Sequence, residues 1–126
     1  MLKILAIDDD DLFLDFLLDW LELHGFQGIE AQQGLLGLQL AKEQTPDLII
    51  CDICMPELDG YEVLKKLRED PVTQKIPFIF LSAEQTDSDY QRAMNLGAND
   101  YLTKFCMTRR LIQAINTQLK AIASPT

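Results

Sequence analysis

Short apolar runs and longer stretches with helically spaced apolar residues alternate five times along the chain. Continuous apolar runs are typical of strands that are buried on both faces, so helices have to cover both sides of the sheet. The pattern therefore predicts an α/β domain with a parallel sheet. The expected strands cover, in chain order, Leu2–Ile7, Gly28–Ala31, Asp47–Cys51, Phe78–Leu81 and Asp100–Thr103. The second is short and more polar than the others, so we expect it at an edge of the sheet.

Five helices are expected between and after these strands. The first runs from about Leu12 to His24, with Asp10 or Asp11 as its cap and Gly25 at its end. Its apolar stripe, which we expect to face the core, comprises Leu12, Phe13, Phe16, Leu17, Trp20 and Leu21. The later helices are expected at about Leu35–Gln44, Tyr61–Arg68 and Asp87–Leu96, and in a last helix, capped by Thr108, that presents Leu111, Ile112, Ile115, Leu119 and Ile122.

The chain has 126 residues, of which 48% are hydrophobic and 25% charged, and this composition fits one domain with one core. It lacks both the run of roughly 18 apolar residues that a membrane helix needs and a signal-peptide pattern, so we expect a cytoplasmic protein that binds no membrane. The net charge of −9 opposes binding of this domain to nucleic acid. Residues 1–60 hold 13 acidic and 2 basic residues, against 7 and 9 in residues 61–126, so the acidity is concentrated in the first half.

Three cysteines, Cys51, Cys54 and Cys106, form an odd set, and in a cytoplasmic chain we expect them to be reduced. Cys51 and Cys54 have the spacing of a zinc-binding pair. A structural zinc site needs about four ligands, however, and the single histidine, His24, lies in the first helix, far from this pair. We therefore assign these thiols no metal.

Polar residues follow four of the five expected strands and point to one shared site. Asp8 and Asp9 follow the first strand, Asp52 follows the third, Ser82 the fourth and Lys104 the fifth. Ligands of open parallel sheets bind beyond the carboxyl ends of the strands, so these side chains have a positional reason to converge. If the strand order is 2-1-3-4-5, the first and third strands are neighbours and the three aspartates share one crevice.

Three aspartates in one crevice need a counter-charge. Two like charges about 4 Å apart repel by about 4 kcal/mol at an effective dielectric of roughly 20, and one ammonium from Lys104 cannot offset all three. Mg²⁺ suits such a site because it prefers oxygen ligands and is often held by one or two carboxylates together with phosphate oxygens. A carboxylate oxygen of Asp52 could then attack a phosphoryl group, with Ser82 and Lys104 as donors to its oxygens.

Four sequence segments carry a family resemblance that extends over essentially the whole chain. Residues 52–60, Asp-Ile-Cys-Met-Pro-Glu-Leu-Asp-Gly, resemble the phosphoacceptor signature of the receiver domains of two-component response regulators. Ile-Asp-Asp at 7–9 resembles the acidic pair of that family, and Phe-Leu-Ser-Ala at 80–83 resembles its hydroxyl-bearing strand end. Gly-Ala-Asn-Asp-Tyr-Leu-Thr-Lys at 97–104 resembles its final strand. Together, in this order and at this spacing, they are far more specific than any one alone.

The resemblance implies a single-domain flavodoxin-like fold, a doubly wound sheet of five parallel strands in the order 2-1-3-4-5 with five helices. The receiver domain would cover residues 1–122, and residues 123–126 would be a tail or the start of a linker. By similarity, Asp52 would be the phosphorylated residue and a ligand of Mg²⁺. Asp9 would bind the ion directly, Asp8 through water, and Cys54 through its backbone carbonyl.

The resemblance also implies how such a domain would signal. Lys104 would contact the phosphoryl group, and Ser82 and Tyr101 would form a switch pair, in which movement of Ser82 makes room for Tyr101 to pack inward. The donor would be a histidine kinase or a phosphotransfer protein, and the target a protein that the sequence does not identify. The chain would be no enzyme beyond its own phosphorylation and dephosphorylation. It would be a monomer, or a homodimer that forms on phosphorylation.

One departure from the family keeps two questions open. The family usually has a cis proline after the lysine, whereas Phe105 and Cys106 follow Lys104 here. A cis bond before a residue other than proline costs roughly 3–4 kcal/mol, so this loop is either trans or strained. An adaptor that keeps the fold and works without phosphorylation is therefore the alternative function.

A phosphatase is a third and weaker hypothesis. Asp8 and Asp10 have the spacing of the haloacid-dehalogenase motif. That motif continues with a hydroxyl-bearing or small residue where this chain has Leu12, and the chain is short for that family and has no cap domain.

Overall fold

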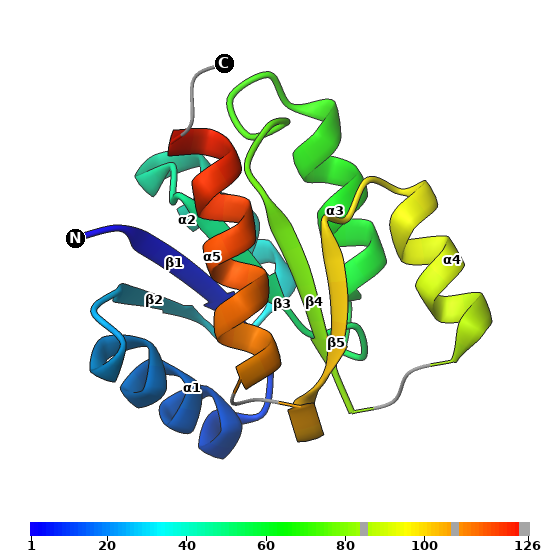
Figure 1. The fold of residues 1–126 in the computed structure, drawn as a ribbon. Helices are drawn as coiled ribbons and strands as arrows, with labels where there is room; N and C mark the ends of the chain where they lie inside the picture. The colour runs from blue at the N-terminus through cyan, green and yellow to red at the C-terminus, as the bar shows by residue number, and fades with distance from the viewer. Residues whose placement is uncertain (84–85, 107–108, 124–126) are drawn as a thin grey trace.

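The computed structural model describes residues 1–83, 86–106 and 109–123, with side chains for all of these except 106 and 121–123. Its centre is a sheet of five parallel strands in the order β2-β1-β3-β4-β5 (Figure 1). The strands are β1 (Lys3–Ile7), β2 (Gln27–Ala31), β3 (Leu48–Cys51), β4 (Phe78–Ser82) and β5 (Asp100–Thr103). The predicted fold class and strand order are confirmed.

Helices cover both faces of this sheet (Figure 1). They are α1 (Asp11–Leu23), α2 (Gly34–Gln44), α3 (Gly60–Glu69), α4 (Asp87–Asn95) and α5 (Arg109–Ala123), with a 3₁₀ turn η1 (Lys104–Cys106) after β5. Helices α1 and α5 pack on one face of the sheet, and α2, α3 and α4 on the other. Successive strand residues point to opposite faces, so Ile4 and Ile50 pack under α1 and α5 while Leu5 and Ile49 pack on the other side.

The predicted buried stripe of α1 is wrong in part. Leu12 is 83% exposed and Phe16 54% exposed, whereas the buried residues are Leu14, Leu17 and Leu21. Nine of the 13 residues of α1 are apolar, so more than one stripe satisfies helical spacing, and periodicity alone could not select the face that meets the sheet. Helix α1 therefore carries apolar side chains on its outer surface as well.

The ends of the helices follow from local capping. Asp10 is the N-cap of α1, because its side chain accepts a hydrogen bond from the backbone N–H of Phe13. The predicted Thr108 cap of α5 lies outside the described residues.

In the part of the chain that the structure describes, no helix has the length and apolar character needed to cross a membrane.

The Arg68 side chain stabilises the sheet at the amino-terminal ends of β4 and β5. Its guanidinium donates to the carbonyl oxygen of Ile76 at 2.7 Å, to that of Gly97 at 2.9 Å and to Oδ1 of Asn99 at 3.1 Å. The same Oδ1 accepts the N–H of Phe78 at 2.9 Å. Arg68 thus joins the end of α3 to the segments that lead into β4 and β5.

Candidate phosphorylation site at the carboxyl ends of the strands

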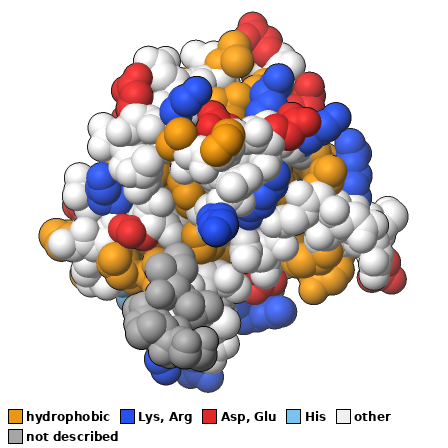
Figure 2. Space-filling view, turned by 90° about the horizontal axis from the view of Figure 1, so that it is seen from above, with side chains coloured by type: hydrophobic (Ala, Val, Ile, Leu, Met, Phe, Trp, Pro, Cys, Tyr) orange, Lys and Arg blue, Asp and Glu red, His pale blue; other side chains and the backbone are white. Residues whose placement is uncertain are grey.

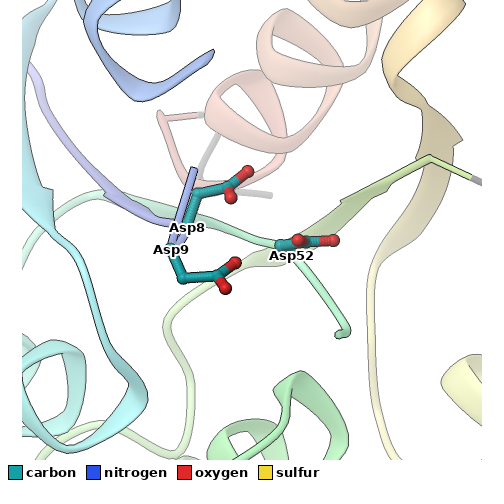
Figure 3. Close-up of side chains that lie close together, drawn as sticks. All are labelled: Asp8, Asp9 and Asp52. Carbon is teal, nitrogen blue, oxygen red and sulfur yellow. The ribbon is translucent and has the colours of Figure 1, made fainter. Parts of the chain in front are cut away.

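The three aspartates meet because their strands are neighbours in register. Ile7 pairs with Cys51, so the residues after them, Asp8 and Asp52, leave the sheet side by side. One carboxylate oxygen from each of Asp8, Asp9 and Asp52 lies within 4.8 Å of the others. Figure 3 shows all three carboxyl groups facing the same space. The predicted convergence of these residues is therefore present, with Asp8 and Asp52 buried and Asp9 exposed.

Lys104 brings a positive charge into this crevice from the end of β5. Its Nζ lies 2.8 Å from Oδ2 of Asp8 and 3.6 Å from Oδ2 of Asp52, and it sits 4.3 Å from the centre of the Phe13 ring. Burial lowers the pKa of Lys104, but the hydrogen bond to Asp8 and the charge of Asp52 outweigh this effect, so that the pKa is raised overall. The ammonium therefore stays charged and holds the two buried carboxylates together.

The loop after Lys104, where the family usually has a cis proline, has a trans peptide bond in this chain. The Lys104–Phe105 peptide bond is trans, and residues 104–106 form the turn η1. This turn directs the Lys104 side chain into the crevice and leaves the Phe105 ring 89% exposed. A cis bond is therefore unnecessary for Lys104 to reach both aspartates.

The carboxyl group of Asp52 differs from an ordinary aspartate. Burial and the neighbouring charge of Asp8 raise its pKa to about 6, although Lys104 and the N–H of Ile53 lower it. The Ile53 N–H donates to Oδ1 at 2.8 Å. At neutral pH the carboxyl group of Asp52 is ionised, but its pKa lies only slightly below the pH. Any additional positive charge in the crevice therefore stabilises its ionised form.

The raised pKa of Asp52 predicts a pH effect on stability. The folded protein binds the proton of this carboxyl group more tightly than the unfolded chain, so its contribution to stability is present at low pH and is lost as pH rises from about 4 through about 6. Without divalent cations, we expect Asp52→Asn to remove this loss and to be more stable than wild type near pH 7.5 by about 1–2 kcal/mol, after discounting for solvent screening.

Urea unfolding in EDTA at several pH values measures this effect. An Asp11→Asn variant is the matched control, because it removes an exposed carboxylate at the start of α1 that is not among the charges that shift the pKa of Asp52. If the wild type and Asp52→Asn lost stability in parallel over this pH range, the altered ionisation of Asp52 would be ruled out.

A second pocket of about 320 Å³ opens beside Asp52 toward α4. Cys54, Ser82, Asp89 and Tyr101 are among the residues that line it. Ser82 is buried at the end of β4, and its hydroxyl is hydrogen-bonded to the Tyr101 side chain. The pocket therefore joins the proposed phosphoacceptor to the proposed switch pair.

The position of Tyr101 differs from the expected resting state of a switch. We expected this ring to pack inward once Ser82 had moved, but it is already only 2% exposed. It lies against Phe80, at 5.9 Å between ring centres, and burial raises the pKa of its hydroxyl. Large aromatic rings gain most from full burial, which favours this inward position.

Asp59 and Gly60, the last two residues of the segment that resembles the phosphoacceptor signature, also start helix α3. Asp59 forms a capping box with Glu62, accepting the Glu62 N–H at 2.9 Å while the Glu62 side chain accepts the Asp59 N–H at 3.2 Å. Gly60 is the first residue of α3 and packs directly on the backbone of Asp52. The signal was available, because Asp followed three residues later by Glu before an apolar run is a helix start.

Asp89 is a site residue that the sequence did not reveal. Its side chain comes from α4, about forty residues after Asp52, and the chain offers no local motif around it. Three-dimensional packing alone brings it to the same pocket.

The acidic crevice is confined to one end of the molecule. Figure 2 looks onto the opposite end, where Lys and Arg side chains are interspersed with Asp and Glu.

The carboxylate oxygens of the three aspartates are the ligand type that Mg²⁺ prefers, and their mutual repulsion favours its binding. The residues present therefore fit a magnesium ion.

The fold and the crevice together define a class: a doubly wound α/β domain with an acidic ligand site at the carboxyl ends of its strands. The sequence model of the response regulator receiver domain matches residues 4–116. The chain belongs to this family, whose members generally bind Mg²⁺ at an acidic pocket and interact with histidine kinases or phosphotransfer proteins.

Individual relatives agree with this assignment. The chain is 35% identical over 119 residues to protein PilH of Pseudomonas aeruginosa, covering 94% of this chain and 98% of PilH. It is 37% identical over 120 residues to the transcriptional regulatory protein PhoP of Bacillus subtilis, covering 95% of this chain but only 48% of PhoP. A solved receiver domain from Clostridium thermocellum superimposes with a TM-score of 0.90 at 29% identity, covering 98% of each chain.

Proposed function

We propose that this chain is a phosphorylation switch that accepts a phosphoryl group on Asp52 from a histidine kinase or a phosphotransfer protein. The observation that carries the proposal is the meeting of three carboxylates with one ammonium, in which Lys104 lies 2.8 Å from Asp8 and 3.6 Å from Asp52. Such a set can bind a divalent cation and a phosphoryl group at the same time, because the positive charges balance the phosphoryl oxygens.

The proposed reaction is a direct transfer. A carboxylate oxygen of Asp52 attacks the phosphorus of a phosphohistidine, so that a P–O bond forms while the P–N bond breaks, and the leaving imidazole nitrogen keeps the electron pair. Lys104 stabilises the negative charge on the phosphoryl oxygens during this step. Ser82, which is buried beside the pocket, donates a hydrogen bond to one of these oxygens.

The residues of the acidic cluster would also bind the metal ion. Asp9 and Asp52 would bind Mg²⁺ through their carboxylates, Asp8 through water, and Cys54 through its backbone carbonyl. When bound, the ion adds positive charge and orients the phosphoryl group. Asp8 would remain paired with Lys104, which keeps the ammonium beside the reacting oxygens.

The output is a change at a protein-binding surface formed by α4, β5 and α5. Phosphorylation adds charge and acceptor oxygens, which draw the Ser82 hydroxyl away from Tyr101 and toward the phosphoryl group. The target protein, a phosphorylation-dependent homodimer, the cytoplasmic location and the absence of turnover on other substrates all stay predictions.

Acetyl phosphate tests this proposal without a partner protein. With Mg²⁺ present, we expect intact-mass spectrometry to detect one added phosphoryl group on the wild type, and none in EDTA or in Asp52→Asn. Asp11→Asn, an exposed carboxylate at the start of α1, is the matched control and should behave as the wild type. An equal adduct on Asp52→Asn, or none on the wild type, would overturn the proposal.

The alternative function is an adaptor that binds its partner without phosphorylation. Its supporting observation is Phe105, an aromatic side chain 89% exposed on the rim of the crevice, where the family usually has proline. An adaptor would bind its partner equally well as the wild type and as Asp52→Asn, whereas a switch would bind with a strength that follows phosphorylation.

A further inference from the structure

Helix α4 buries little apolar surface against the rest of the molecule. Ala93 is its one fully buried residue, and Met94 is only partly buried against the core. Elements with little apolar burial open locally at low free-energy cost. Any specific contact that ties α4 to its neighbours therefore has a large influence on its position.

Tyr61 of α3 supplies such a contact. Its hydroxyl donates to Oδ1 of Asp89 at 3.3 Å and lies 3.5 Å from the Asp89 carbonyl oxygen. The Arg92 guanidinium carbon stands 4.0 Å from the centre of the Tyr61 ring. The Tyr61 ring packs against the ring of Phe80, at 5.3 Å between ring centres. We refer to Tyr61, Asp89 and Arg92 as the α3–α4 latch.

The latch lies between two pockets. On one side, Tyr61 and Arg92 line a groove of about 670 Å³ between α3 and α4. On the other side, Asp89 lines the pocket that contains Asp52 and Ser82. Asp89, whose carboxylate accepts a hydrogen bond from a tyrosine of α3, therefore lines the same pocket as Asp52.

We propose that Asp89 senses the charge of phosphorylated Asp52 and that the α3–α4 latch passes this signal to helix α4. The inference rests on the proposed phosphorylation of Asp52. The phosphoryl group carries about two negative charges where the carboxylate of Asp52 carried one, so the same small pocket becomes more negative and the like charge of Asp89 is repelled. Asp89 then moves away from the pocket, its hydrogen bond with Tyr61 breaks, and α4 loses an attachment that burial does not replace.

Two features of the latch suit this role. Burial and the charge of Asp89 raise the pKa of Tyr61 to about 12, so its hydroxyl keeps its proton and donates at neutral pH. Among the described residues that line this pocket, Asp89 is the one acidic residue besides Asp52.

Amide hydrogen exchange of the whole chain tests the inference. Beryllofluoride, which mimics the phosphoryl group, is added together with Mg²⁺. In the wild type we expect the backbone amides of residues 87–95 to exchange about fivefold faster when beryllofluoride is bound. In Asp89→Asn the increase should fall below about twofold, because the amide still accepts the Tyr61 hydrogen bond but carries no charge.

Two further variants separate charge from hydrogen bonding. Tyr61→Phe keeps the ring contacts and removes the hydroxyl, so α4 should exchange about fivefold faster already without beryllofluoride and respond little to it. Asp87→Asn removes an exposed carboxylate from the same first turn of α4 and should respond as the wild type. The amides of α1 serve as an internal reference for global stability.

The outcomes distinguish this inference from the proposed function. Fluorine NMR shows whether beryllofluoride is bound. Bound beryllofluoride with unchanged exchange in α4, or with equal increases in the wild type and Asp89→Asn, would refute the latch and leave the phosphorylation site intact. Failure of beryllofluoride to bind the wild type would refute the phosphorylation site, and the latch with it.

Discussion

Replacing Lys104 by Met should change two measurable properties in opposite directions. Phosphorylation by acetyl phosphate should slow by about 10²- to 10³-fold, because the ammonium no longer stabilises the charge of the transferred group. Binding of Mg²⁺ should become about tenfold tighter, because a competing positive charge 2.8 Å from Asp8 and 3.6 Å from Asp52 is gone. Intact-mass time courses and calorimetric titration with Mg²⁺ measure the two effects.

The stability of the Lys104→Met variant should also depend on the metal. In EDTA we expect a loss of about 2–4 kcal/mol in the free energy of unfolding, because buried Asp8 and Asp52 lose their partner. Mg²⁺ should restore most of it by binding the folded state. Lys66→Met, an exposed lysine on α3, is the control. Weaker Mg²⁺ binding in the Lys104 variant would contradict the account of the charges in the crevice.

Gly60→Ala should damage both the fold and the site. A Cβ at this position would overlap the backbone oxygen of Asp52 and lie 2.9 Å from Cα of Ile53, and backbone atoms cannot move aside as flexible side chains do. We expect a loss of about 3 kcal/mol in the free energy of unfolding, at the upper end for overpacking. Because the clash displaces Asp52 itself, phosphorylation should fall even in molecules that remain folded.

Gly28→Ala is the matched control for this prediction. Its new Cβ would meet Cδ2 of Leu18 at 2.5 Å, which is the far end of a flexible side chain. The cost should stay within about 1 kcal/mol, and phosphorylation should be unaffected. Urea unfolding and phosphorylation rates compare the two variants. If Gly60→Ala matched Gly28→Ala in both measurements, close packing of α3 on the Asp52 backbone would not matter for the site.

The acidic crevice could be predicted from the sequence because the geometry of parallel sheets is so constrained. Once the apolar runs were recognised as strands, Asp8 and Asp52 had to emerge at the same edge, and the order of strands made them neighbours. Lys104 follows the last strand and reaches the same place. Each of these positions depends on a strand end, which is a local feature of the sequence.

The features that the sequence did not reveal depend on packing between distant segments. The buried face of α1 could not be chosen because apolar residues surround most of that helix. The contact of Tyr61 with Asp89 joins residues 28 positions apart on different helices, and no periodicity encodes it. The inward position of Tyr101 depends on the aromatic side chains around it, which include Phe80.

Reductive trapping identifies the phosphorylated residue itself. Borohydride reduces an aspartyl phosphate to homoserine, so the modified position can be located by tandem mass spectrometry after treatment with acetyl phosphate and Mg²⁺. We expect homoserine at position 52, with aspartate retained at positions 8 and 9. Homoserine at position 8 or 9, or aspartate retained at all three positions, would contradict this expectation.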